Sequence, residues 1–102
     1  MKEEVLPIRK ETELNYKKLM GMVQPDDSLL LLMHGSPDPD AMASAMALHE
    51  IVLREKGLSK SAFVSTEPLI RQQNIEFASS MHTHIQLMTQ VDIHAYRLIT
   101  LM

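Results

Sequence analysis

The sequence predicts an α/β fold, a parallel sheet with flanking helices, from three stretches of the chain. Residues 29–33 are wholly apolar, which is typical of a strand buried on both faces of a parallel sheet. Residues 39–56 carry apolar side chains at helical spacing, and residues 62–65 form a second apolar run. Strand, helix and strand in this order indicate a β-α-β unit with both strands parallel in one sheet.

The residues before the first strand predict a helix and a turn. Residues 1–8 are charged and include a proline, so we expect a flexible lead-in. Residues 10–22 place apolar side chains roughly at helical spacing between lysines and glutamates, which predicts an amphipathic helix that covers the sheet. Residues 25–28, Pro-Asp-Asp-Ser, are typical of a turn.

The helix at 39–56 has recognisable start and stop signals. Asp38 is a favourable N-cap, and Pro39 suits the first helical position because the N–H that proline lacks has no partner there. Gly57 suits the left-handed conformation that commonly ends a helix. We expect an inward stripe of Met42, Ala45, His49 and Val52.

The remainder of the chain predicts a helix at 70–80, a short strand at 85–88, a turn or a single helical turn at 91–96, and a last strand at 97–102. Because the sequence stops on an apolar strand, we expect a single domain over 1–102 that is truncated at this point. An open strand edge can pair with a second copy, so a homodimer is a further expectation.

The composition excludes several classes of site and partner. The net charge is −3 and no basic stripe is present, which argues against recognition of a nucleic-acid backbone. The absence of cysteine excludes disulfides and thiolate zinc sites and favours the cytoplasm. No apolar run approaches the ~20 residues that span a bilayer, so we expect no membrane association.

The candidate site follows the first strand, where His34, Asp38 and Asp40 precede and begin the helix. Ligands of open α/β sheets bind at this end of the strands. One imidazole and two carboxylates are the groups that hold a hard or borderline divalent cation. An alternative interpretation makes Asp38 a helix cap and Asp40 a partner of the helix dipole, in a non-catalytic α/β binding or regulatory module. The spacing alone leaves both interpretations open.

The stretch 33–48, MHGSPDPDAMASAMAL, resembles the first motif of the DHH phosphoesterase superfamily. The likeness lies in a buried strand, His-x-x-x-Asp-x-Asp and Ser44 in register before an amphipathic helix. This superfamily includes RecJ-like exonucleases, oligoribonucleotide and cyclic-dinucleotide phosphodiesterases, exopolyphosphatases and family II inorganic pyrophosphatases. Pro39 stands where the family usually has glycine between the aspartates, and it stiffens the turn.

The resemblance implies the N-terminal, Rossmann-like part of a metal-dependent phosphoesterase. His34 and Asp38 would bind one Mn²⁺ or Mg²⁺ ion and Asp40 a second, with no further catalytic residue in this stretch. A water activated by the two metals would hydrolyse a phosphodiester or phosphoanhydride. The substrate could be an oligonucleotide, a cyclic dinucleotide, polyphosphate or pyrophosphate. The other metal ligands of the family would lie beyond Met102, so the chain alone would be inactive.

The other histidines predict less. His82 and His84 form a His-x-His pair that can bind zinc, but solvated loop imidazoles are the simpler interpretation. His49 falls on the apolar stripe of the main helix and is expected to be buried or at the boundary of the core.

Overall fold

The computed structural model describes residues 10–102, and their side chains from residue 15 onward. The expected lead-in at 1–8 lies outside the described residues. The elements in chain order are α1 (Lys10–Met22), β1 (Asp27–Met33), α2 (Pro39–Lys56), β2 (Leu58–Ser65), α3 (Gln72–Ser80), β3 (Ile85–Leu87), the 3₁₀ turns η1 (Met88–Gln90) and η2 (Ile93–Ala95), and β4 (Leu98–Leu101).

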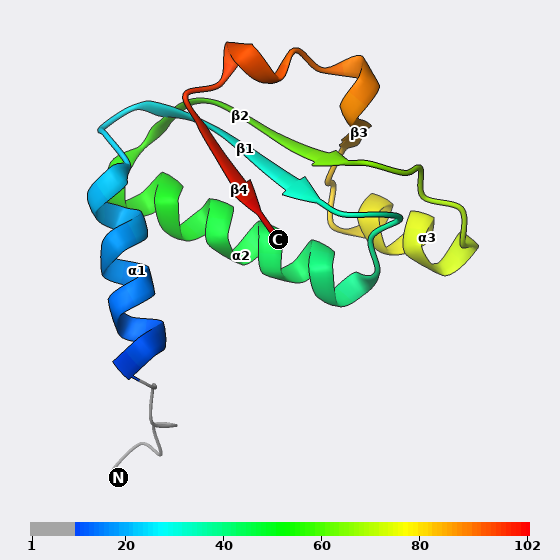
Figure 1. The fold of residues 1–102 in the computed structure, drawn as a ribbon. Coiled ribbons are helices and arrows are strands. Elements are labelled where there is room, and N and C mark those ends of the chain that lie inside the picture. Colours follow the sequence, from blue (N-terminus) through cyan, green and yellow to red (C-terminus); the bar gives the residue numbers. More distant parts are fainter. Residues whose placement is uncertain (1–9) are drawn as a thin grey trace, which may run out of the picture.

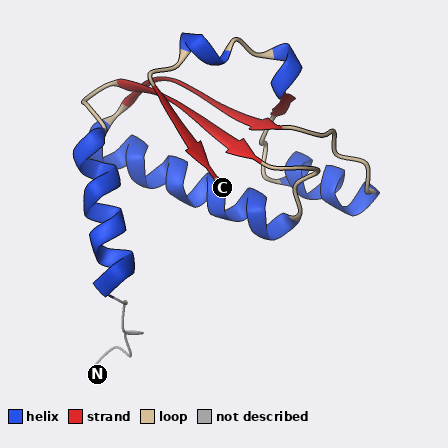
Figure 2. Cartoon of the chain, viewed as in Figure 1, coloured by secondary structure: helices blue, strands red, loops and turns tan. Residues whose placement is uncertain are grey.

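The described strands form one parallel sheet of four strands in the order β3-β2-β1-β4. The predicted α/β fold is therefore confirmed. The central strand β1 pairs along its whole length with β2, with Leu31 opposite Phe63, and on its other side with β4, with Leu31 opposite Thr100. The three α-helices lie on one side of the sheet, and the connection between β3 and β4 crosses the other side (Figures 1 and 2).

Strand β1 is buried on both faces, as its unbroken apolar run predicts. Leu29, Leu31 and Met33 belong to the core on the helical side, and Leu30 belongs to a second cluster on the opposite side. The helical core also contains Met20, Val23, Met42, Ala45, Val52 and Ala78. Helix α2 supplies the centre of this core because the spacing of its buried residues keeps them on one face.

The opposite face of the sheet is covered by the η1–η2 connection. Leu30, Ala62 and Val64 are buried there, and Met88, Val91, Ile93 and Tyr96 pack against them. The Lys60 ammonium also lies 4.6 Å from the centre of the Tyr96 ring. At edge strand β4, Leu101 is 77% exposed, so the cover of this face is incomplete.

Among the α1 side chains that the structure describes, Leu19 and Met20 pack against the core, while Tyr16 and Met22 are exposed. One strand differs from the sequence prediction. Strand β2 begins at Leu58, four residues before the predicted strand at 62–65. Its polar start is a strand because it pairs with β1.

The sequence analysis also did not predict an ion pair that the structure shows at the amino end of the sheet. Asp27, expected in a turn, is buried at the start of β1 and forms an ion pair with Arg97, which precedes β4. The Asp27 carboxylate accepts hydrogen bonds from the backbone N–H groups of Gln24 (2.9 Å) and Ser28 (2.8 Å). The hydrogen bond from Arg97 is the main reason that the pKa of Asp27 lies far below its usual value.

Helix α2 begins and ends where its signals predict. Gly57 ends the helix with φ of 77° and ψ of 157°, a positive-φ extended conformation in place of the expected left-handed helical one, and its N–H donates to the Leu53 carbonyl. A Cβ at this position would lie 2.7 Å from Asp26 Oδ1, so a larger residue would also clash. In the described part of the chain, no helix is long and apolar enough to cross a membrane.

Candidate functional site

The candidate site is the loop from β1 to α2, at the carboxyl end of the central strand (Figure 1). Gly35 has φ of 73°, a left-handed conformation that favours glycine. The Gly35 N–H donates to Thr66 Oγ1 (2.6 Å), and its carbonyl accepts from the Glu67 N–H (3.2 Å). These hydrogen bonds join the loop after β1 to the loop after β2.

Helix α2 begins as predicted. Asp38 has extended backbone angles, and its Oδ1 accepts a hydrogen bond from the Ala41 N–H at 2.8 Å. Pro39 occupies the first helical position and Asp40 lies in the first turn. The cap interpretation of Asp38 is therefore confirmed as geometry. Asp38 Oδ2 takes no part in this cap and could bind a second partner.

The three predicted metal ligands are exposed but lie toward different spaces. His34 follows the end of β1 and lines a hollow of about 270 Å³ with Leu32, Thr66, Leu101 and Met102. Asp38 lines a second cavity, and Asp40 lies in the first turn of α2. Among the described residues, no group of three or more His, Asp or Glu side chains is placed to hold a metal ion. The loop brings the three residues to one end of the sheet without converging their donor atoms.

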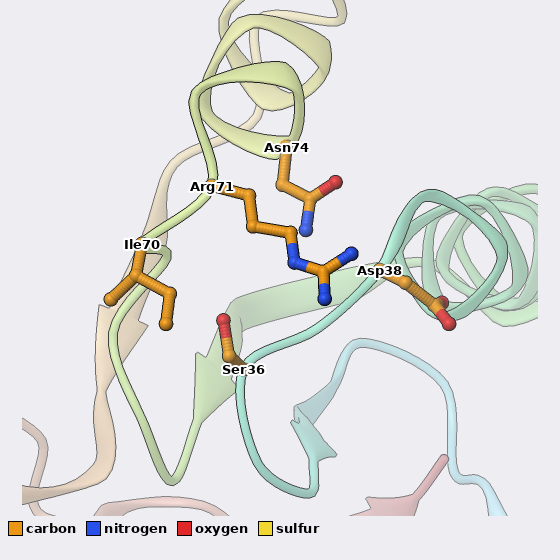
Figure 3. Close-up of a pocket in the computed structure, with 5 residues that line it drawn as sticks. All are labelled: Ser36, Asp38, Ile70, Arg71 and Asn74. Atoms are coloured by element: carbon orange, nitrogen blue, oxygen red, sulfur yellow. The ribbon is translucent and has the colours of Figure 1, made fainter.

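The cavity beside Asp38 has a volume of about 340 Å³. It lies between the β1–α2 loop and the start of α3, and it is lined by Ser36, Asp38, Ile70, Arg71 and Asn74. The guanidinium of Arg71 extends from the start of α3 toward the loop that carries Ser36 and Asp38 (Figure 3). The lining residues thus include a cation, a hydroxyl and a carboxamide, while the Asp38 carboxylate points away from the Arg71 guanidinium (Figure 3).

Two of the residues that line this cavity each contain a buried polar atom without a hydrogen-bond partner among the described residues: Ser36 Oγ and Asn74 Oδ1. Asn74 is only 4% exposed, and its Nδ2 donates to the Pro37 carbonyl at 3.3 Å. This hydrogen bond fixes which end of the carboxamide is the acceptor. Leaving a buried carbonyl unpaired costs about 1–3 kcal/mol.

Arg71 and Asn74 were missed by the sequence analysis, which expected only a helix at 70–80. One usable signal was Asn74 itself, because asparagine is unfavourable within a helix unless its side chain is used in a hydrogen bond. Nothing in the sequence indicated that the acceptor of this hydrogen bond is Pro37, 37 residues away.

The other histidines lie outside this site. His49 is half-buried, with Nε2 2.8 Å from Ser61 Oγ and its ring centre 5.1 Å from that of Phe63. Its burial lowers its pKa below the usual 6.5. This is the boundary position that the apolar stripe predicted. His82 and His84 are exposed.

Comparison of this chain with protein-family models, with curated proteins and with solved structures finds no match.

Proposed function

We propose that this chain is the N-terminal part of the catalytic domain of a metal-dependent phosphoesterase of the DHH type. The observation that carries the proposal is the placement of His34, Asp38 and Asp40 between the end of central strand β1 and the first turn of α2. Parallel α/β sheets bind their ligands at this end. The proposed family rests on the resemblance of Met33–Leu48 to the first DHH motif. The proposed substrate is a phosphodiester or phosphoanhydride.

The donor set fits a hard divalent cation, Mn²⁺ or Mg²⁺. All three side chains are exposed, so none has to leave a packed core to reach a metal. Asp38 can keep its cap through Oδ1 and offer Oδ2. When bound, two such ions supply an activated water and neutralise charge on the phosphate. The remaining ligands would come from residues of the complete polypeptide beyond this chain.

A rigid support for the three ligands also favours the proposal. The two backbone hydrogen bonds of Gly35 hold the loop after β1, and the Met42 N–H donates to the Asp38 carbonyl at 3.0 Å. A site on regular elements and a hydrogen-bonded loop holds its geometry better than a site on a free loop does.

The cytoplasm is the proposed compartment.

A second candidate is a non-catalytic α/β module in which the acidic turn serves only as a helix cap. The 2.8 Å hydrogen bond from the Ala41 N–H to Asp38 favours this candidate, because a cap explains one of the two aspartates without a metal. In this candidate Asp40 only interacts favourably with the helix dipole, and a glutamate at this position would do the same.

Hydrolysis by the complete polypeptide separates the two candidates. We expect Mn²⁺-dependent hydrolysis of bis(p-nitrophenyl) phosphate that is lost in Asp38→Asn and in Asp40→Asn, while the circular dichroism spectrum and Tm stay close to wild type. Glu50→Gln is a matched control, since this acidic residue lies farther along α2 and pairs with Arg54. Near-wild-type activity in both aspartate variants would reject the phosphoesterase.

A further inference from the structure

We propose that a second copy of this chain pairs with the free edge of β4, so that the two β4 strands run antiparallel and join two sheets into one. The twofold axis passes between Thr100 and its counterpart, and Ile99 lies opposite Leu101 of the second copy. The homodimer expected from the sequence thereby gains a surface, a register and a symmetry. This pairing requires neither a metal ion nor hydrolysis, so it stands independently of the proposed function.

The two edges of the sheet differ in how far they are blocked (Figure 1). Edge strand β3 is short, and its Leu87 N–H already donates to Gln90 Oε1 at 3.2 Å. Strand β4 has the sequence Leu-Ile-Thr-Leu, without the charge or proline that commonly keeps other chains away from a strand edge. The neighbouring charge of Arg97 is paired with Asp27 of β1, on the inner side of β4. Strand β4 is therefore open to a further strand.

The backbone groups of β4 alternate between β1 and the free edge. The Met102 N–H donates to the Leu32 carbonyl at 2.9 Å, so the even-numbered residues of this strand bond toward β1. Ile99 and Leu101 consequently direct their N–H and C=O groups outward, where no described strand lies. An antiparallel copy with Ile99 opposite Leu101 satisfies these groups, because such a pair exchanges both of its N–H···O=C hydrogen bonds.

The side chains of β4 suit an identical neighbour. Ile99 and Leu101 lie on the face of the sheet opposite the helices, and they are 45% and 77% exposed. In the proposed pair each of these apolar side chains contacts the other across the twofold axis, and Thr100 contacts its own counterpart. Like charges repel when identical strands pair, but residues 98–102 carry no charge. These features favour a second copy over a partner with charged recognition residues.

The test uses disulfide cross-linking, since the chain has no cysteine of its own. In the proposed register the two Thr100 Cα atoms lie about 4.5 Å apart, within the range of about 4.4–6.8 Å that a disulfide bridges. We expect Thr100→Cys at micromolar concentration, oxidised with copper phenanthroline, to form a disulfide-linked dimer at least about tenfold faster than Thr89→Cys, because pairing raises the local thiol concentration to the millimolar range. Thr89 is a matched control because it is exposed and follows the opposite edge strand.

Further variants define the register and the edge. The Ile99→Cys residues of the two copies lie on a diagonal about 7–8 Å apart, too far for a disulfide, so this variant should cross-link no faster than Thr89→Cys. Adding Leu101→Lys to Thr100→Cys should remove the fast cross-linking at almost unchanged Tm, because Leu101 is 77% exposed. Adding Ile70→Lys should leave the rate unchanged, since Ile70 is 74% exposed but lies outside β4.

Three results would overturn the proposal, provided that the circular dichroism spectrum and Tm show each variant to be folded. Equal rates for Thr100→Cys and Thr89→Cys would mean that β4 does not pair with a second copy in this register. An Ile99→Cys dimer that forms as fast as the Thr100→Cys dimer would mean that the strands pair in another register. Fast cross-linking of Thr100→Cys that survives Leu101→Lys would mean that a different surface brings the thiols together.

Discussion

Asp38 is the residue at which the cap and the metal site make different predictions, and two substitutions separate them. Its Oδ1 accepts from the Ala41 N–H at 2.8 Å, so Asp38→Ala removes a formed cap. We expect this to lower the free energy of unfolding by about 0.5–2 kcal/mol. Asp38→Asn keeps an oxygen acceptor and loses only the charge near the helix N-terminus. The expected loss is about 0.3–1 kcal/mol.

The assay pairs urea unfolding, followed by circular dichroism, with Mn²⁺ binding by the complete polypeptide, followed by calorimetry. The neutral amide of asparagine is a far weaker ligand for Mn²⁺ than a carboxylate, so Asp38→Asn should weaken Mn²⁺ binding nearly as much as Asp38→Ala does, although it folds nearly as well as wild type. The free energy of unfolding would then decrease from wild type to Asp38→Asn to Asp38→Ala, whereas Mn²⁺ would bind to the wild type and only weakly to either variant.

The reasoning is refuted if Mn²⁺ binding follows the stability ranking, with Asp38→Asn close to wild type. Asp38 would then serve only as a cap. The Asp38→Ala stability also tests the structure, because an unchanged free energy of unfolding would mean that the hydrogen bond to Ala41 contributes nothing.

Three further predictions concern the fold and its association. Burial lowers the pKa of His49, so the unfolded state binds a proton on this residue more readily than the folded state does. The free energy of unfolding should therefore fall as the pH drops below 6.5. Urea titrations of His49→Gln should show a smaller fall, and a fall of unchanged size would contradict the prediction. Arg97→Met should lower Tm, and it should reduce the acid-induced loss of Tm that sets in below about pH 4, because the hydrogen bond from Arg97 is the largest of the contacts that stabilise the ionised carboxylate of Asp27. A homodimer through β4 should appear in light scattering and be lost in Leu101→Lys at almost unchanged Tm; a monomeric wild type would contradict that expectation.

Local signals account for most of the fold. The cap at Asp38, the proline at 39 and the glycine at 57 predicted the bounds of α2, because each of these residues acts on its own turn of the chain. The apolar run at 29–33 predicted a strand buried on both faces, since only a central parallel strand needs apolar side chains at every position.

The parts that local patterns missed depend on distant partners. Asp27 begins β1 and its carboxylate accepts from Arg97, which is 70 residues away. The polar start of β2 is a strand because it pairs with β1. The cavity at Arg71 and Asn74 arises in the same way, because its other wall belongs to the β1–α2 loop. Sequence identified the acidic loop but not the cavity beside it.

The most direct measurement of the central claim is anomalous diffraction at the manganese edge from crystals of the proposed longer polypeptide grown with Mn²⁺. The account predicts anomalous peaks within coordination distance of His34, Asp38 and Asp40, and their loss in crystals of Asp40→Asn for the ion that this residue holds. Well-ordered density for residues 34–40 without an anomalous peak at saturating Mn²⁺ would contradict the metal site and leave the helix cap as the role of the acidic turn.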